Sequence, residues 1–509
     1  MPEYLSPGVY IEEVRGQQPI EGVGTSTGAF VGLATKGPIG KAELVANWTQ
    51  FVDKFGGLTT DGYLGYAVYQ FFAEGGTRCY VVRTCHYSGD PKKPDATSAN
   101  GILKDAQDAA TLKATASSPG KWGKTLSVKI ETASDGGNLF KMIILQNSVE
   151  VESFDNLSMS EKDANNQPNE NYVESRIDGI SKFIFIDLAT NSTKNPPKQN
   201  TTFPLDQDGV DGITGLIQSD FIGDESLQNG LHAFDPIDDI NIVAIPDSPV
   251  TGNGLVKEAT TYCENRRDCF FVADPPIGLK PSGVGNGTIR GFKQGLTSMY
   301  GALYYPWVII NDPLNGTRKT IPPSGAVAGS YSKTDITRGV HKAPAGTIDG
   351  ALNIAVDVET LVAKGEQDSL NPEGINVIRS FPDAGLVIWG ARTLASKTNP
   401  EYRYVNIRRL FIFLEESIEE ATQYVVFEPN SPALWGTVKR DISAFLTTVW
   451  RSGALFGLSP EEAFFVKVDA ENNPPEVRDA GRLIIDVGVA PVKPAEFVII
   501  RFSQKTQLA

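Results

Sequence analysis

The chain has little of the side-chain chemistry on which most catalytic and metal sites depend. Only three histidines occur in its 509 residues. They are His86, His232 and His341, and none stands at a metal-ligand spacing from another histidine or from a cysteine pair. We therefore expect no catalytic residue and no metal ligand, and we interpret each histidine as a surface or structural residue.

Cysteine is also scarce, which fits a reducing compartment and excludes a disulfide framework. The four cysteines form two pairs, each with five residues between its members: Cys79 with Cys85, and Cys263 with Cys269. That gap is wider than the usual zinc spacing. We interpret all four as small buried core thiols.

Long apolar runs and an excess of positive charge are missing as well. No run reaches the roughly 18 apolar residues of a membrane span. The first residues, MPEYLSPGVY, have neither the basic nor the apolar region of a secretory signal. The net charge of -15 argues against a general nucleic-acid binder. The expectation is cytoplasmic assembly, without membrane insertion and without a nucleic-acid partner.

Glycine-rich segments imitate nucleotide-binding loops but depart from their spacing. Gly120–Thr125 has two residues between its first glycine and its Gly-Lys pair, where a phosphate loop needs four. The segments Gly22–Gly24 and Gly283–Gly285 lack the third glycine of a dinucleotide fingerprint. We therefore expect no cofactor.

What the chain does contain is a strand–helix–strand rhythm, which predicts an α/β layer. Its expected strands are residues 29–34, 80–83, 240–246, 269–272 and 307–310, all sharing one sheet. The expected helices are residues 47–55, 63–73, 255–265 and 290–300. Between residues 98 and 230 the chain changes to short alternating strands and polar loops, which predicts a β-rich domain inserted into the first one.

Length and pattern together predict a multidomain α/β protein, since 509 residues are too many for one core. The predicted α/β domain is discontinuous, residues 21–97 and 231–373, and the inserted domain is 98–230. A C-terminal α/β domain spans residues 374–509. In it, Ser431 is the expected N-cap of a helix with proline at its first position.

Both ends of the chain are strand-like. Residues 1–20 form a predicted N-terminal arm, and residues 491–509 a C-terminal arm after the Pro491/Pro494 elbow. Such strands need sheet neighbours, so we expect each arm to be donated to another subunit. The expected arm contacts are Val9, Tyr10, Ile11, Glu12, Val14, Phe497, Val498, Ile499, Ile500 and Phe502. A loose glycine-rich segment, residues 16–28, tethers the first arm.

One predicted helix of the last domain carries opposite charges at its two ends. Arg408 and Arg409 lie at its start, and four glutamates lie near its end, where acids oppose the helix dipole. These acids are Glu415, Glu416, Glu419 and Glu420. Two interpretations stay open: a solvated face, or a face that contacts another subunit or partner.

Several segments, in order, resemble one family. They are SPGVYIEEV from Ser6, TGAFVGLATKGP from Thr27, SPGKWG from Ser118, RGVHKAPAG from Arg338, WGARTL from Trp389, YVNIRRLFIFLEESI from Tyr404, VFEPNSPALW from Val426 and GVAPVKPAEFVI from Gly488. Together they are similar to the sheath proteins of contractile phage tails, R-type pyocins and contractile injection particles. The resemblance covers both ends, the first domain and the whole last domain, but little of residues 98–230.

This resemblance implies a structural protein, not an enzyme. Such sheaths are stacked hexameric rings around an inner tube, ending at baseplate and cap proteins, with arms that join the sheets of neighbouring subunits. The last domain faces the tube and the inserted domain points outward. Contraction is a rigid-body rotation from a metastable extended state to a compact one.

Two other classes of protein remain as alternatives. An α/β enzyme with a β-rich substrate domain would fit the layer pattern, although no catalytic motif supports it. A non-contracting tube or adhesion protein of the same particle would not need arms at both ends. The residues leave open whether the particle is a phage tail, a released injection device or one docked at a membrane through its baseplate.

Overall fold

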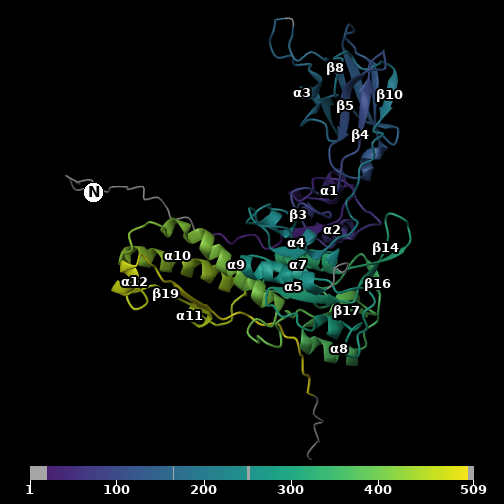
Figure 1. Cartoon of the computed structure of the whole chain (residues 1–509). Helices are drawn as coiled ribbons and strands as arrows, with labels where there is room; N and C mark the ends of the chain where they lie inside the picture. Colours follow the sequence, from purple (N-terminus) through teal and green to yellow (C-terminus); the bar gives the residue numbers. More distant parts are fainter. Residues whose placement is uncertain (1–19, 164, 249–252, 502–509) are drawn as a thin grey trace, which may run out of the picture. The chain divides into compact units, whose positions relative to one another are not determined.

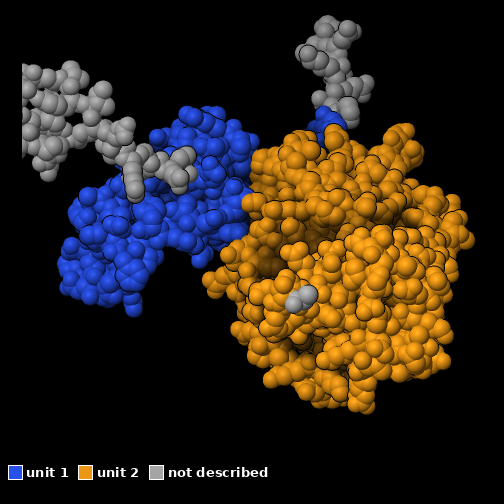
Figure 2. Space-filling view, turned by 90° about the horizontal axis from the view of Figure 1, so that it is seen from above, with its two compact units in different colours: residues 1–23, 410–509 blue, residues 24–409 orange. Residues whose placement is uncertain are grey.

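The computed structural model describes residues 20–163, 165–248 and 253–501. The chain forms two compact units, one of residues 1–23 and 410–509, the other of residues 24–409. We call them unit 1 and unit 2; Figure 2 colours them blue and orange. The expected N-terminal arm contacts, from Val9 to Val14, and Phe502 at the other end lie outside the described residues.

Unit 2 is built on an eight-stranded sheet (Figure 1). In sheet order its strands are β18 (Gly385–Ile388), β17 (Ile375–Phe381), β13 (Gly301–Tyr305), β12 (Phe270–Ala273), β11 (Ile242–Ala244), β1 (Gly28–Gly32), β3 (Cys79–Arg83) and β2 (Ala42–Val45). All neighbours pair in parallel except at the two edges, β17 with β18 and β2 with β3. Strand β1 pairs with β3 on one side and with β11 on the other, so the prediction that the sheet continues after the insertion is confirmed.

Helices cover this sheet. The larger ones are α1 (Trp48–Phe55), α2 (Leu64–Ala73), α5 (Asn253–Arg266) and α7 (Ser324–Arg338). Asn47 caps α1 by accepting from the backbone of Gln50, as its position before the helix requires. Helix α7 packs closely on α2: a Cβ on Gly325 would lie 2.4 Å from the Cα of Ala67. Shorter helices complete the unit: α4 (Gln218–Ile222), α6 (Ile289–Lys293) and α8 (Lys364–Leu370).

Two expectations for the middle of unit 2 were wrong. The helix expected over 290–300 ends at Lys293, because Gly295 takes a left-handed φ of 84° and turns the chain toward β13. Residues 307–310 do not join the large sheet. Pro306, which has no N–H for a ladder, separates β13 from β14 (Val308–Asn311). Strand β14 instead forms a small sheet with β15 (Arg318–Ile321) and β16 (Ala355–Val358).

The β-rich insertion has the predicted character. One of its sheets has the order β10 (Thr201–Pro204), β6 (Leu126–Thr132), β7 (Phe140–Gln146), β8 (Val149–Leu157). The other has the order β4 (Asn100–Lys104), β5 (Ala110–Ala116), β9 (Ile184–Leu188). The alternating apolar residues of both sheets share one buried core, to which the short helix α3 (Val173–Ile177) contributes both of its end residues.

Unit 1 consists of two long helices and a pair of strands. Helix α9 (Val405–Thr422) crosses from unit 2 into unit 1 along the chain, and α10 (Pro432–Arg451) follows. Ser431 caps α10 as predicted, accepting from the backbone of Leu434. The strands β19 (Phe464–Lys467) and β20 (Asp486–Val489) are antiparallel. Two short helices, α11 (Pro460–Ala463) and α12 (Pro475–Asp479), lie beside them in the chain.

The boundary of the last domain does not fall at residue 374, where the sequence predicted it. Strands β17 and β18 come after that residue and extend the large sheet, where β17 pairs with β13. An apolar run such as Ile375–Phe381 fits any sheet, and only its partner strand decides to which domain it belongs. The division between the compact units falls between Arg409 and Leu410 instead.

Candidate functional site

Doubly wound sheets bind ligands where the strand order reverses, at the carboxyl ends of the strands. Here that point lies between β1 and β11, and Asp247 follows β11. The Asp247 carboxylate is 1% exposed and accepts from the backbone N–H groups of Leu33 at 2.9 Å and Tyr63 at 2.6 Å. Burial nevertheless raises the pKa of Asp247 to about 6.

Side chains fill the space around these strand ends. The ring of Tyr63 meets the ring of buried Trp307 edge-on, with centroids 5.2 Å apart. Tyr66 is fully buried and donates to Asp312 at 3.1 Å. Asp274, at the end of β12, accepts from the backbone of Ser324 at 2.9 Å, and burial raises its pKa to about 8. These polar groups serve internal packing at the position where an enzyme of this fold would hold its substrate.

The scarce cysteines and histidines lie apart from any shared site. The four cysteines are buried and form no disulfide, as expected of small core thiols. Burial raises the pKa of Cys85 to about 11 and keeps the thiol protonated. His86 pairs with Asp220, and His232 with Asp235, each at 2.9 Å. Within the described ranges, no three acidic, histidine or cysteine side chains are grouped as metal ligands.

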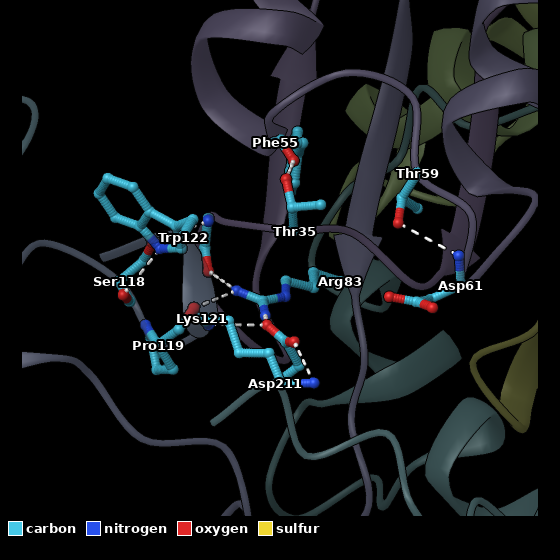
Figure 3. A network of polar contacts seen from close by, with 11 residues as sticks. Thr35, Phe55, Thr59, Asp61, Arg83, Ser118, Pro119, Lys121, Trp122 and Asp211 are labelled. Carbon is cyan, nitrogen blue, oxygen red and sulfur yellow. Dashed lines mark hydrogen bonds and ion pairs between the residues drawn. The ribbon is translucent and has the colours of Figure 1, made fainter. Parts of the chain in front are cut away.

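The segment that imitates a phosphate loop joins the insertion to the α/β part (Figure 3). Residues Lys121–Thr125 form a 3-10 helix, and the turn before it faces Arg83 at the end of β3. The buried guanidinium of Arg83 donates to the carbonyl groups of Gly37 at 3.1 Å and Pro119 at 2.6 Å. Burial lowers the pKa of Arg83 to about 10.

Asp211 stands on the return path from the insertion and connects the same elements. It accepts from the backbone N–H of Lys121 at 3.0 Å, and its carboxylate lies 3.9 Å from the Arg83 guanidinium. From the other side, Ser118 accepts from the backbone of Gly37 at 2.9 Å. The SPGKWG motif therefore positions the inserted domain on the α/β part.

The C-terminal segment is extended and exposed. Described residues after Val489 belong to no strand, apart from a bridge between Pro491 and Leu455. The apolar side chains of Phe497, Val498, Ile499 and Ile500 are between 71% and 79% exposed. Four consecutive apolar side chains in water favour association over solubility, so this segment has the character of an interaction site.

The strand pair β19–β20 lies just before this segment in the chain. No further strand pairs with either outer edge in the part of the chain that the structure describes. Phe465 stands directly opposite Gly488 and covers it, since a Cβ there would lie 2.1 Å from the ring. The ring itself is 59% exposed. Strand β19 was not predicted, because its four-residue run gives only a weak local signal.

The start of helix α9 differs from the exposed basic end that the sequence predicted. Arg408 and Arg409 are 2% and 4% exposed. The Arg408 guanidinium lies 4.8 Å from the centre of the Tyr300 ring, and Arg409 pairs with Asp335 at 2.6 Å. Both cations are therefore used inside unit 2, because aromatic and carboxylate partners from distant parts of the chain meet them there. Two adjacent arginines in the sequence do not indicate that Tyr300 and Asp335 will be their partners.

The acidic end of α9 is accessible. Glu415, Glu419 and Glu420 are exposed and Glu416 is half-buried. Near the same end, the loop between α9 and α10 carries Phe427, which is fully exposed and has a left-handed φ of 70°. Of the six charged contact candidates on this helix, Glu415, Glu419 and Glu420 are the exposed ones.

Comparison with known proteins identifies the family. Residues 222–394 match the model for the phage tail sheath protein central domain, and residues 397–505 match the model for the phage tail sheath C-terminal domain. The chain belongs to the phage tail sheath protein family. Both the family and the structural neighbours of this sheath chain are structural proteins, not enzymes.

Curated relatives of the sheath chain are tail sheath proteins of phages. That of Vibrio phage KVP40 is 27% identical over 258 residues, which cover 47% of this chain and 37% of the relative. That of Enterobacteria phage T4 is 22% identical over 271 residues, covering 50% and 40%. The matched region thus spans well under half the length of these relatives.

Solved structures resemble the sheath chain over nearly its whole length. The helical sheath of the anti-feeding prophage in its contracted state is 25% identical, covers 99% of this chain and 100% of its own, and gives a TM-score of 0.58. A sheath tail protein from Desulfitobacterium hafniense shares the fold at 13% identity, with coverage of 91% and 94% and a TM-score of 0.60. A search of the described helices finds none with the length and hydropathy of a membrane span.

Proposed function

We propose that this chain is the subunit of a contractile sheath, which assembles as stacked hexameric rings around an inner tube and drives the tube through a target envelope. The observation that carries the proposal is the exposed apolar segment Phe497–Ile500, which is extended and belongs to no sheet in its own chain. The likeness to a helical sheath in its contracted state supports it.

Strand donation is the proposed means of assembly. A donated strand gains a full ladder of main-chain hydrogen bonds and buries its apolar side chains. The proposed acceptor is β19–β20 of a neighbouring subunit, because this pair has unpaired outer edges among the described residues and an exposed ring at Phe465. The N-terminal strand around Val9–Val14 would join the same sheets, so that each subunit is linked to its neighbours through both ends.

The elbow between β20 and the arm supports this role. The backbone N–H of Val492 donates to Ala454 at 3.0 Å, and that of Phe456 donates to Ala490 at 2.7 Å. The chain is thus anchored up to the elbow, and the following residues are presented from a fixed point. Contraction would then change the angle at Pro494 while the donated strand stays in place.

The acidic end of α9 is the proposed contact with the inner tube or with another ring. Its exposed carboxylates, Glu415, Glu419 and Glu420, form a single-sign patch that would favour a partner with basic side chains. Baseplate and terminal cap proteins are the other proposed partners, and assembly in the cytoplasm is the proposed location. Which kind of particle the sheath serves depends on those partners.

Contraction requires that subunits gain contact area when they rotate into the compact state. Each ring contributes a modest free energy, at about 25 cal/mol per Å² of apolar surface removed from water. The sum over many rings can drive a tube through an envelope, provided that a kinetic barrier holds the extended state.

Electron microscopy of the chain expressed alone tests the proposal. Ridged, hollow tubes with six-fold rings are expected at high protein concentration. Removing residues 495–509 should leave a folded monomer with an unchanged melting temperature that forms no tubes. Tubes of normal appearance from this truncation would contradict strand donation, and uniform small particles from the intact chain, even with inner-tube protein added, would contradict the sheath role.

A further inference from the structure

The inserted domain contains an edge strand whose outward N–H groups are all occupied by side chains. Strand β9 pairs with β5 on one side only. On the other side, the N–H of Ile186 donates to Asp178 at 2.8 Å and that of Leu188 donates to Glu174 at 3.0 Å. The N–H of Ile184 donates to the Ser181 hydroxyl at 3.2 Å. These three donors alternate along the strand, as the outward N–H groups of an edge strand do.

The three acceptors come from one short segment, helix α3 and the turn after it. Glu174 lies in α3 and Asp178 directly follows it. The hydroxyl of Ser181 also donates to Glu152 of β8 at 2.6 Å, so its orientation is held by the second sheet. A neighbouring strand could bond to β9 only by displacing this set of acceptors, two of which are carboxylates.

Without these acceptors β9 would be a good template for strand addition. Its sequence is Ile-Phe-Ile-Asp-Leu, and the side chains of Phe185 and Leu188 are 42% and 36% exposed. Exposed, apolar edge strands pair readily with other strands. In a chain that is proposed to carry apolar strands at both ends, such an edge would capture arms at the wrong place.

Two other edges of unit 2 are restricted by different means. Strand β18 is flanked by residues 346–352, with the N–H of Leu352 donating to Leu386 at 2.9 Å. Strand β10 ends in Pro204, which has no N–H to offer. By contrast, β19 and β20 have no strand partner on their outer edges among the described residues.

We propose that Glu174, Asp178 and Ser181 close the β9 edge against the chain's own terminal strands, and so prevent strand exchange between subunits at this edge of the inserted domain. These three residues determine specificity in assembly. They accept hydrogen bonds from the outward N–H groups of β9, which a terminal strand would need in order to pair there. This inference rests on the proposed strand donation for its biological purpose, but the closure of β9 can be measured independently of it.

The test uses the full-length chain with Glu174→Ala and Asp178→Ala together. The matched control, Glu170→Ala with Asp206→Ala, removes the same charge from two exposed acids of the same domain. A second control, Glu174→Gln with Asp178→Asn, keeps an oxygen acceptor at both positions. The probe is a fluorescent, photo-crosslinkable peptide of residues 494–504, and hydrogen exchange reports on the β9 amides.

In the alanine variant we expect the peptide to crosslink to residues 184–188. It should bind there roughly 25-fold more tightly than to either control, since two donors are freed and each net hydrogen bond is worth about fivefold in affinity. Exchange at Ile186 and Leu188 should accelerate in that variant alone. A folded alanine variant with no peptide at β9 would overturn the inference. Should the double variant unfold, Asp178→Ala alone is judged by the same two readouts.

The two proposals fail in different ways. Peptide captured at β9 of the alanine variant, but never at β19–β20 of the wild-type chain, would support the closed edge and count against strand donation. Peptide at β19–β20 in every variant, with none at β9, would support strand donation and overturn the role of Glu174 and Asp178.

Discussion

The guanidinium group of Arg409 donates to both carboxylate oxygens of Asp335, at 3.0 and 2.6 Å. It also donates to the backbone carbonyl of Thr25 at 2.7 Å and lies 4.8 Å from the centre of the Tyr331 ring. Thr25 and Arg409 stand next to the two points at which the chain passes between unit 1 and unit 2. The buried Arg409 side chain therefore connects Thr25, near the start of unit 2, and its own position at the end of unit 2 to helix α7.

Replacing Arg409 with methionine should destabilise unit 2 by about 3–5 kcal/mol, because the Asp335 carboxylate then stays buried without its cation. Urea unfolding of the full chain measures the change. The control is Arg338→Met at the end of helix α7, the helix that carries Asp335. The half-exposed side chain of Arg338 lies 3.6 Å from Asp349 and should contribute less than about 1 kcal/mol. Equal effects of the two substitutions would contradict the anchoring role of Arg409.

Gly22 makes a close contact that the predicted loose segment did not include. A Cβ at Gly22 would lie 2.6 Å from the ring of Phe413 on α9, and the N–H of Val23 donates to Ser417 at 3.1 Å. The described part of the glycine-rich segment is thus packed on α9, and the glycine is needed for the close approach.

The substitution Gly22→Val should displace the Phe413 ring and destabilise unit 1 by about 1–3 kcal/mol, the usual cost of overpacking. Gly24→Ala is the matched control, because its added Cβ would meet only the end of the Arg78 side chain, at 3.9 Å. Thermal unfolding followed by near-ultraviolet circular dichroism reports on both variants. An unchanged transition in Gly22→Val would show that the segment leaves α9 at little cost.

How far the sequence predicts this structure depends on the range of the interactions involved. The buried strands β1, β11 and β12 were predictable, because parallel strands covered on both faces are continuous apolar runs. Helix α10 was predictable from a local signal, Ser431 followed by proline. The insertion was predictable from its alternating pattern, which differs from that of the surrounding α/β part.

The remaining features depend on partners far away in the chain. The burial of Arg409 depends on Asp335 and Thr25, and no local pattern distinguishes it from an exposed arginine. The place of β17 depends on β13, and the edge closure of β9 depends on where α3 happens to lie. The apolar segment Phe497–Ile500 is recognisable in the sequence, because an apolar strand at a chain end is unusual in any context, and its role in assembly stays a prediction.

The buried carboxyl groups at the strand ends give unit 2 a defined pH dependence. Burial raises the pKa of Asp274 to about 8 and that of Asp247 to about 6, above their values in the unfolded chain. The folded state therefore binds more protons than the unfolded state between the ordinary aspartate pKa and these values. The free energy of unfolding therefore falls as pH rises through this window. The contribution of protonated Asp274 decreases until about pH 8, where it is lost.

We expect the midpoint of urea unfolding to decrease steadily between pH 5 and about 8 and the Asp274→Asn variant to show a shallower decrease. The amide keeps the size of the protonated acid but does not ionise. The variant should therefore be similar to wild type below about pH 4, where the acid is protonated in both states, and its advantage over wild type should grow from there up to about pH 8. Asp206→Asn, an exposed position, serves as the control. Parallel curves for wild type and Asp274→Asn would contradict a buried, protonated Asp274.

The proposed donated strand can be tested without shortening the chain. Ile499 is 79% exposed and belongs to no strand of its own chain, so Ile499→Pro should leave the melting temperature of the monomer unchanged within about 1 °C, as expected for a surface substitution. Proline has no N–H for a ladder and clashes with a central strand, so the same variant should form no tubes. Ile499→Thr keeps the β-branched shape and the N–H group, and it should form tubes at a somewhat higher protein concentration.

Sedimentation and electron microscopy of the three proteins at matched concentrations distinguish the outcomes. Normal tubes from Ile499→Pro would mean that the segment makes only side-chain contacts between subunits, whereas a lowered melting temperature would place it in the fold of its own chain.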